Sequence, residues 1–220
     1  MLKKIDTLKL AYKEETKFLF SELGYIVLGQ LIAKKDNATL DNALFQVLVE
    51  AGMRDTKYHP SASPYLIVPS GYNHGVVQGK AGNKLAHFLG AAGNAGLFTN
   101  IDNVGKLMQL LLYKGKLPLA ARIFSEEVID LFTAKVTVKG YNNTRALGWD
   151  TIPATNPPCG TKFSKNSFGM SDPSGSYVWS DKDKGISIVL LANGYFPVGG
   201  HPQDEMQGKI SDAIMTALGY

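Results

Sequence analysis

The chain has 220 residues, a formal net charge of +4 and a single cysteine; 45% of its residues are hydrophobic and 19% are charged. This apolar content is enough for one folded domain over residues 1–220, which excludes a disordered protein. The lone Cys159 excludes a disulfide scaffold and a zinc site of paired cysteines. The scattered lysines form no basic stripe, so we expect no binding of nucleic acid.

No apolar run approaches the roughly 18 residues that a membrane span requires, and the first residues lack the apolar stretch of a secretory signal. We therefore expect a cytoplasmic protein with no membrane span. The four histidines share no metal-ligand spacing, so we expect neither a metal site nor a cofactor. They are His59, His74, His87 and His201.

Two helices are predicted near the N-terminus. Ser21 is a suitable N-cap for a helix that runs to about Lys34, and its broad apolar face predicts that this helix is largely buried. Thr39 begins a second helix whose apolar residues repeat at helical spacing. Gly52 ends this second helix in a left-handed conformation.

Helical spacing is lost between Met53 and Phe98, where prolines and glycines interrupt any regular element. So long a stretch without periodicity predicts a surface loop system that shapes a site or covers something. Regularity returns with an amphipathic helix through residues 104–112, closed at Lys114 and Gly115. A further helix begins at Ser125 and ends near Thr133.

Short runs typical of β-strands follow at residues 146–149, 176–179 and 186–192. A polar turn at residues 180–185 predicts that the last two runs pair antiparallel. The run 186–192 is apolar on both faces, which predicts a central strand with neighbours on each side and cover above and below. A final helix begins at Pro202 and is predicted to pack on the sheet through five apolar residues: Met206, Ile210, Ala213, Ile214 and Ala217. The order of elements predicts an α+β fold.

Several segments resemble the serine β-lactamase and penicillin-binding-protein superfamily, and most of all its class C-like branch of esterases and D-amino-acid peptidases. They occur in the family's order and cover nearly the whole chain: residues 17–29, 40–56, 93–99, 145–150, 168–176 and 188–193. The resemblance implies a β-lactamase-like transpeptidase fold in which a helical region precedes a short antiparallel sheet covered by a C-terminal helix.

Enzymes of that superfamily acylate the serine of a Ser-x-x-Lys motif, and a Tyr-x-Asn motif and a Lys-Thr-Gly or His-Thr-Gly motif complete the site. No serine or threonine of this chain has a lysine three positions later. The resemblance therefore implies the C-terminal portion of the fold, without the nucleophile helix and the first strands.

The remaining motifs fall on altered residues. Phe20 and Glu22 stand where the family has the tyrosine and the asparagine, and a phenyl ring cannot exchange a proton. We expect Phe20 to be a buried core aromatic and Glu22 an exposed carboxylate of the first helical turn. Met170, Ser171 and Asp172 replace the third motif. Pro173 follows, at the position from which family enzymes donate a backbone N–H to the oxyanion hole, and proline has no such hydrogen.

Three hypotheses on function remain open. The first is a non-catalytic relative with a binding or structural role, in which a remnant cleft holds a small-molecule or peptide ligand. The second is an active serine hydrolase, cleaving amide or ester bonds, that is completed by a separate segment carrying Ser-x-x-Lys. The third is a truncated or mispredicted gene product with no selected function.

The predicted sheet has only three strands, and this suggests that the protein has a partner. A sheet that lacks strands leaves an apolar surface or edge open, and such surfaces are usually buried by a partner. We therefore expect a homo-oligomer or a companion chain over the open sheet.

Overall fold

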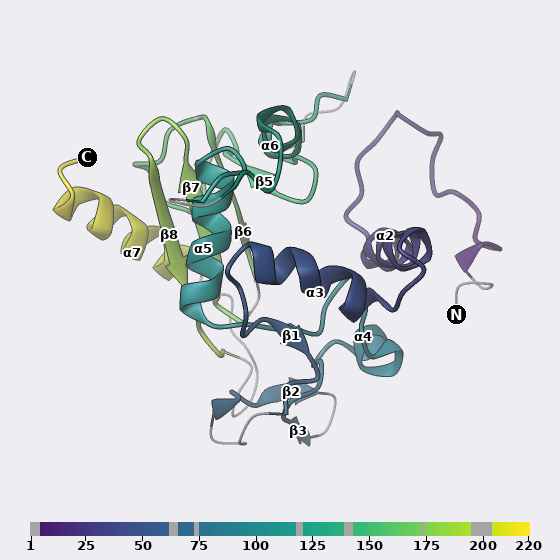
Figure 1. The fold of residues 1–220 in the computed structure, drawn as a ribbon. Helices are drawn as coiled ribbons and strands as arrows, with labels where there is room; N and C mark the ends of the chain where they lie inside the picture. The colour runs from purple at the N-terminus through teal and green to yellow at the C-terminus, as the bar shows by residue number, and fades with distance from the viewer. Residues whose placement is uncertain are drawn as a thin grey trace.

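The computed structural model describes residues 5–61, 66–72, 75–117, 121–138, 143–172, 174–194 and 204–220. A helical part comes first, and a four-stranded antiparallel sheet with a C-terminal helix comes last. Figure 1 shows the sheet with helix α5 across one face and helix α7 beside the other, while α2 lies on the far side of the molecule from α7. The predicted α+β arrangement is confirmed.

The sheet contains β5 (Asp150–Thr151), β6 (Ser167–Ser171), β7 (Tyr177–Asp181) and β8 (Ile186–Leu190), in that order. Every neighbouring pair is antiparallel, and the predicted turn joins β7 to β8. Side chains alternate between the two faces along each strand. Tyr177, Trp179 and Ile188 face α7, whereas Phe168, Val178 and Val189 face α5.

One strand prediction was wrong in detail, and one strand was missed. Residues 146–149 form a turn in which Gly148 has a φ of 93°, and the strand begins only at Asp150. Strand β6 was not predicted, because its serines, glycine and methionine do not alternate as apolar and polar residues do in a half-buried strand. Its pairing with β7 supplies the pattern that the local sequence lacks.

The prediction that residues 186–192 form a central strand was also wrong. In the described part of the chain β8 pairs with β7 alone and therefore lies at one edge of the sheet. Its two faces are nevertheless covered as predicted, one by Met215 of α7 and the other by Met108 and Leu111 of α5. Burial on both faces explains why the run is apolar throughout.

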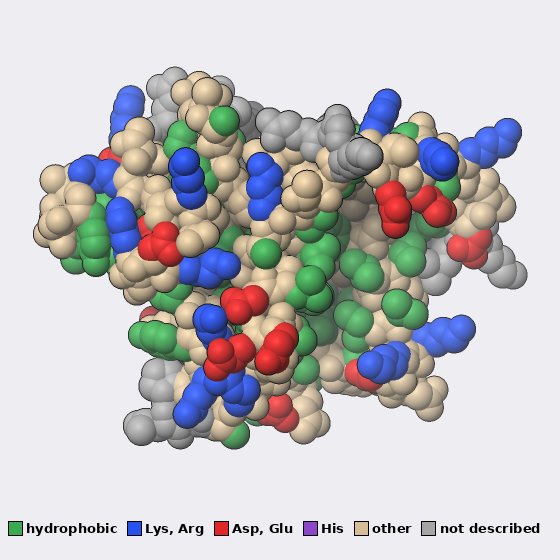
Figure 2. All heavy atoms as spheres, turned by 90° about the horizontal axis from the view of Figure 1, so that it is seen from above, with side chains coloured by type: hydrophobic (Ala, Val, Ile, Leu, Met, Phe, Trp, Pro, Cys, Tyr) green, Lys and Arg blue, Asp and Glu red, His purple; other side chains and the backbone are tan. Residues whose placement is uncertain are grey.

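Helices α2 (Glu22–Lys35) and α3 (Leu40–Glu50) begin and end as predicted, after Ser21 and Thr39 and before the left-handed Gly52. The expected burial of α2 is wrong. Only Ile26 and Gly29 of this helix are buried, and four of its apolar side chains are exposed: Val27, Leu28, Leu31 and Ile32. Figure 2 shows hydrophobic side chains gathered toward the middle of the face that it displays.

The described residues between Met53 and Phe98 form the expected loop system, but the system contains short elements. They are the paired strands β1 (Lys57–Tyr58) and β4 (Leu97–Phe98), the hairpin of β2 (Ser70–Tyr72) and β3 (Gly75–Val77), and helix α4 (Lys84–Leu89). Asn83 caps α4 by accepting hydrogen bonds from the backbone of Leu85 and Ala86. This asparagine was the local signal for the helix.

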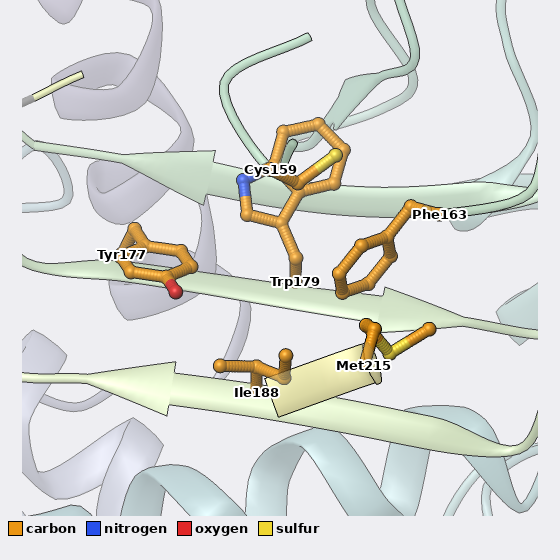
Figure 3. Close-up of a cluster of buried hydrophobic side chains, with 6 residues drawn as sticks. All are labelled: Cys159, Phe163, Tyr177, Trp179, Ile188 and Met215. Atoms are coloured by element: carbon orange, nitrogen blue, oxygen red, sulfur yellow. The ribbon is translucent and has the colours of Figure 1, made fainter. Parts of the chain in front are cut away.

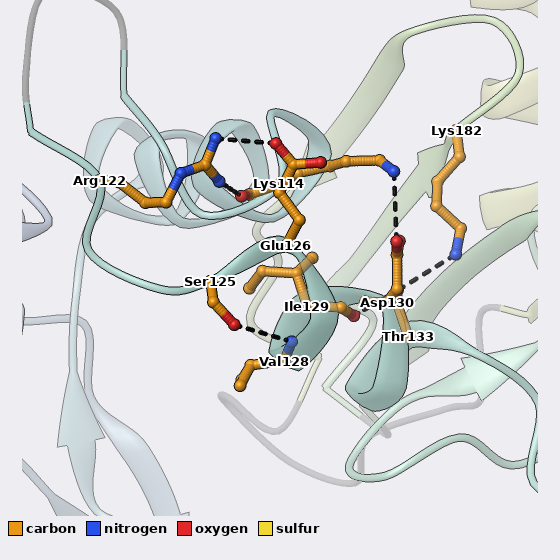
Figure 4. Close-up of polar contacts among 9 residues, drawn as sticks. All are labelled: Lys114, Arg122, Ser125, Glu126, Val128, Ile129, Asp130, Thr133 and Lys182. Carbon is orange, nitrogen blue, oxygen red and sulfur yellow. Dashed lines mark hydrogen bonds and ion pairs between the residues drawn. The ribbon is translucent and has the colours of Figure 1, made fainter.

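Helices α5 (Ile101–Leu112) and α6 (Glu126–Thr133) confirm the predicted amphipathic pair, with turns at Lys114 and Gly115 and a cap at Ser125. Figure 4 shows how α6 is anchored. Lys114 pairs with Asp130 at 3.2 Å, and the Lys182 ammonium, which follows β7, donates to the Thr133 hydroxyl at 3.1 Å. Burial lowers the pKa of Lys182.

Helix α7 (Asp204–Ala217) packs on the sheet as predicted, but by another face. The buried stripe is Gln207, Ser211 and Met215, while Met206 and Ile214 of the predicted face are exposed. Polar residues face the sheet because they form hydrogen bonds there. The Tyr177 hydroxyl lies 2.7 Å from the Ser211 hydroxyl, and the Gln207 side chain donates to the Gly175 carbonyl at 2.9 Å. Pro202, where the helix was predicted to begin, lies outside the described residues.

Trp179 occupies the middle of the main core cluster and is fully buried. Figure 3 shows it surrounded by Cys159, Phe163, Tyr177, Ile188 and Met215. In the neighbouring strand Gly169 lies directly opposite, and any side chain there would run into the indole ring and the Val178 carbonyl. The large ring fits because its neighbour has no side chain.

We predict that Gly169→Ala lowers the free energy of unfolding by about 1–3 kcal/mol, because an added methyl overpacks a close-packed core. The matched control is Gly105→Ala in α5, where no atom lies within 4 Å of the added carbon. That change should be neutral or stabilise by up to about 1 kcal/mol, the helix preference of alanine over glycine. Urea denaturation measures both, and equal effects at the two positions would contradict the packing argument.

Candidate functional site

An open cleft of about 1100 Å³ lies between the sheet and the segments that precede it. Its walls come from four parts of the chain: the start of α2, the loop system around α4 and β4, the segment from Arg145 to Asp150, and the ends of β6 and β8. The expectation that residues 53–98 help to shape a site is therefore consistent with their position. Five of the six family-equivalent positions can be placed, because Pro173 lies outside the described residues.

Phe20 lies in the wall of this cleft and is 52% exposed, so the prediction of a buried core aromatic is wrong. The Arg145 guanidinium lies 5.2 Å from the centre of the Phe20 ring and 5.6 Å from that of Phe18. Such cation–π contacts are worth about 0.5–1 kcal/mol at exposed sites.

Arg145 also forms an ion pair with Asp150, with 2.6 Å between the two side chains. Both are partly buried, at 16% and 31% side-chain exposure. Burial raises the pKa of Asp150 above its ordinary value, although the charge and hydrogen bond of Arg145 act to lower it. The pair links β5 to the segment that carries Phe18 and Phe20.

Glu22 is half-buried and hydrogen-bonded, which corrects the expectation of an exposed carboxylate. It accepts a hydrogen bond of 2.6 Å from the side-chain amide of Asn83, and Asn83 in turn accepts one of 3.2 Å from Asn94. Asn83 thus joins the start of α2 to the N-terminus of α4. The backbones meet nearby, since a side chain at Gly93 would run into the Tyr25 carbonyl of α2.

The third motif position lies at the end of β6, where Met170, Ser171 and Asp172 all line the cleft. The Ser171 hydroxyl is buried and has no hydrogen-bond partner among the described residues. Asp172 turns the chain: its carboxylate accepts the backbone N–H of Ser174 at 2.8 Å, and its own N–H donates to the Ser176 carbonyl. The structure thus brings Phe20, Glu22 and the third motif to one cleft.

The remaining candidates lie elsewhere. Cys159 is fully buried in the core cluster around Trp179, and burial raises the pKa of its thiol to about 12, so it is an unreactive packing residue. Trp179 is a core residue as well. Trp149 packs edge-on against Phe168, with 5.5 Å between the ring centres. Of the histidines, His74 and His201 lie outside the described residues.

Several polar residues of the cleft were not predicted, among them Asn83, Asn94, Arg145 and Asp150. Arg145 and Asp150 belong to a segment that carries the family resemblance, but no spacing rule marks them as a pair across a turn. Asn83 could have been identified as a helix cap, which would have placed it without assigning it to a cleft.

We predict that Arg145→Met lowers stability near neutral pH by about 1–3 kcal/mol, because it leaves the Asp150 carboxylate partly buried without its partner. An acid whose pKa is raised by folding loses folded-state stability as the pH rises through that pKa. Without the guanidinium the pKa of Asp150 rises further. The effect of the substitution should therefore be smaller at an acidic pH, where Asp150 takes up a proton, than at neutral pH.

Urea denaturation at the two pH values measures this difference, with Lys114→Met as the matched control. Lys114 and its partner Asp130 are both half-exposed, so that variant should lose at most about 0.5 kcal/mol at either pH. An equal loss at both pH values for Arg145→Met would contradict the assigned role of the ion pair.

Comparison with known proteins identifies relatives of this chain and of its fold. The chain spans about half the length of the curated relatives that it matches. The N-acetylmuramyl-L-alanine amidase of Bacillus subtilis is 26% identical over 211 residues, which cover 86% of this chain and 47% of the relative. A putative D-alanyl-D-alanine carboxypeptidase of Escherichia coli strain K12 is 25% identical over 214 residues, which cover 87% and 48%.

Solved structures show the same fold. A β-lactamase from Mycobacterium bovis superimposes with a TM-score of 0.68 at 17% identity, over 95% of this chain and 67% of its own. A class C β-lactamase gives a TM-score of 0.68 at 18% identity, over 97% and 61%. None of the helices in the described part of the chain is long and apolar enough to cross a membrane. Residues 1–211 match the family described as Beta-lactamase, and the chain belongs to that family.

Proposed function

We propose that this chain is a binding member of the Beta-lactamase family, which holds a small-molecule or peptide ligand in the cleft without transferring an acyl group. One observation carries the proposal: Phe20 and Met170, which stand where the family resemblance puts a tyrosine and a cation or imidazole, both line the cleft. Neither side chain can accept or donate a proton, so general acid–base catalysis has no group at either position.

The surroundings of Phe20 support this assignment. The ring carries the Arg145 guanidinium on its face, and that guanidinium is held by Asp150. The position is therefore occupied by a half-exposed aromatic ring that contacts the Arg145 guanidinium in the wall of the cleft. The chain has a cleft in which apolar residues such as Leu97 and Leu191 lie beside polar ones, a combination typical of ligand sites.

A second candidate is a serine hydrolase for amide or ester bonds, completed by a further polypeptide that carries Ser-x-x-Lys. Two features favour it. The chain spans only about half of its curated relatives, which are named as an amidase and a carboxypeptidase. Among the described residues, the outer edge of β8 has no neighbouring strand. The outer side of α2, which consists of Val27, Leu28, Leu31 and Ile32, is exposed as well. Both surfaces are free to contact a further polypeptide. Phe20 and Met170 count against it, since an added segment cannot change them.

Exposure to a penicillin and, separately, to a fluorophosphonate tests the proposed function. We expect the intact mass of this chain to stay unchanged, because no described cleft residue matches an activated nucleophile. An active serine hydrolase treated in parallel controls for the reagents. A stoichiometric adduct on this chain would overturn the proposal, and an adduct on a co-purifying polypeptide would favour the second candidate.

The exposed apolar side chains on the outer side of α2 lead to a prediction about partners. We propose that a companion polypeptide covers it, because a helix that is apolar on all sides is normally buried on all sides. Leu28 and Leu31 are 53% and 60% exposed. Light scattering on protein from its native source should give a mass above that of one chain, and Leu28→Glu with Leu31→Glu should reduce it.

Lys34→Gln is the matched control for that experiment, since it changes the charge of the same exposed helix by one unit while leaving the apolar face intact. It should leave the assembly unchanged. Mass spectrometry of the assembly separates a companion chain from a second copy of this one. A monodisperse monomer from the native source would contradict the proposed partner.

A further inference from the structure

Lys182 is a partly buried amine that lies outside the cleft, so the proposed function does not use it. It follows β7, at the first residue of the turn that leads to β8. Figure 4 shows its side chain reaching helix α6, where the ammonium donates to the Thr133 hydroxyl at 3.1 Å. That hydroxyl is buried and donates its own hydrogen to the Ile129 carbonyl at 2.7 Å. It is therefore left to accept a hydrogen bond from Lys182.

In the described part of the chain the direct partners of this ammonium are uncharged. Besides the Thr133 hydroxyl, its nitrogen lies 5.8 Å from the centre of the buried Phe168 ring. Lys182 takes part in no ion pair with any described residue, because the carboxylate of Asp130 is already paired with Lys114 at 3.2 Å. A lysine that leaves water without a carboxylate partner holds its proton less firmly than an exposed lysine does.

Three charged groups act on Lys182 from the elements packed around it. Asp130 of α6 and the neighbouring Asp183 favour the ammonium, whereas Lys114, in the turn after α5, disfavours it. Burial has the largest effect of all, and it lowers the pKa of Lys182. A larger fraction of this amine is therefore uncharged near neutral pH than in an exposed lysine. The uncharged amine is the nucleophilic form, and a desolvated lysine is one kind of activated nucleophile.

Position and charge thus agree. We propose that Lys182 is a site of acylation by small acyl phosphates, and that its acylation releases the last turn of α6 from the sheet. The ammonium first gives one proton to water, and the uncharged nitrogen then attacks the acyl carbon. A C–N bond forms, the C–O bond to phosphate breaks, and phosphate leaves with the electron pair. A second proton passes from the nitrogen to water, which leaves an uncharged amide.

The release follows from what acylation removes. An ammonium has three hydrogens and a positive charge, whereas the amide nitrogen has one hydrogen and no charge. The acyl group also takes up space between Lys182 and α6. The last turn of this helix has one other polar anchor in Figure 4, the ion pair of Lys114 and Asp130. Both of its members are half-exposed, and such pairs contribute at most about 1 kcal/mol. Ile129 stays in the core, so the release is confined to the end of the helix.

Limited acetylation of the full chain by acetyl phosphate near neutral pH tests the site. The reaction is stopped at a low average degree of acetylation, and each lysine is quantified by peptide mapping with a protease that does not cleave at lysine. Lys182 should be acetylated about threefold faster than Lys106, because it carries more of the uncharged amine. Lys106 is an exposed lysine of α5 whose ammonium donates to the Gly52 carbonyl at 2.9 Å. In guanidinium chloride the two rates should become equal.

Lys114→Met is the test variant for the charge environment. It removes the cation that disfavours the Lys182 ammonium and leaves Asp130 free to pair with that ammonium. Acetylation of Lys182 should therefore slow to about the rate of Lys106. Lys106→Met is the matched control, since it removes a lysine from the same part of the chain without changing the surroundings of Lys182. It should leave the rate at Lys182 unchanged.

Hydrogen exchange of the acetylated chain, followed by mass spectrometry, tests the release of α6. Backbone amides in the last turn of α6 should exchange faster than in the unmodified chain, whereas those of α5 should not change. Lys182→Met removes the same hydrogen bond without an acyl group. This variant should reproduce the faster exchange in α6 when no acetyl phosphate is present.

Each part of the inference can fail separately. Acetylation of Lys182 no faster than that of Lys106 in the folded chain would overturn the proposed site. A rate at Lys182 that survives Lys114→Met would overturn the assigned effect of the neighbouring charges. Unchanged exchange in α6 after acetylation of Lys182 would overturn the proposed release of the helix.

Discussion

The pairing register between β6 and β7 determines which residues of β6 reach the cleft. The packing of the Trp179 ring against Gly169 determines that register. Trp179 fills the core on the α7 side of the sheet only because Gly169 lies opposite it. A slip of one residue would place Phe168 or Met170 against the indole and would turn every side chain of β6 to the other face. With the register set, Met170, Ser171 and Asp172 reach the cleft at the end of the strand.

The second constraint is the attachment of the helical part to the sheet. Close backbone contact between α2 and the loop at Gly93 requires a glycine, and the hydrogen bonds from Glu22 through Asn83 to Asn94 span the same junction. On the other side, Arg145 joins Asp150 to the rings of Phe18 and Phe20. Residues of both attachments line the cleft, so its polar residues stabilise its walls as well as line them.

The distribution of exposed apolar side chains shows which elements are fully packed by other described residues. The sheet is covered on both faces, and its strands are accordingly well packed. Helix α2 has the composition of a buried helix and only two buried residues. Helix α7 shows the reverse, since its buried stripe contains a glutamine and a serine that meet specific partners, and several of its apolar residues are exposed. Apolar pattern alone therefore identifies each helix without identifying its packed face.

The sequence by itself determined the order and type of the longer helices and of the last two strands, because caps, left-handed glycines and helical spacing are local signals. Ser125, Gly52 and the turn before Ile186 each act within a few residues. It also determined that Phe20 and Met170 have no proton to exchange. Only the tertiary structure decided that β6 is a strand, that β8 lies at an edge among the described strands, that Gln207 rather than Met206 is buried, and that Phe20 is exposed beside Arg145. Those outcomes depend on contacts between residues far apart in the chain, and such contacts leave no periodic signal in the sequence.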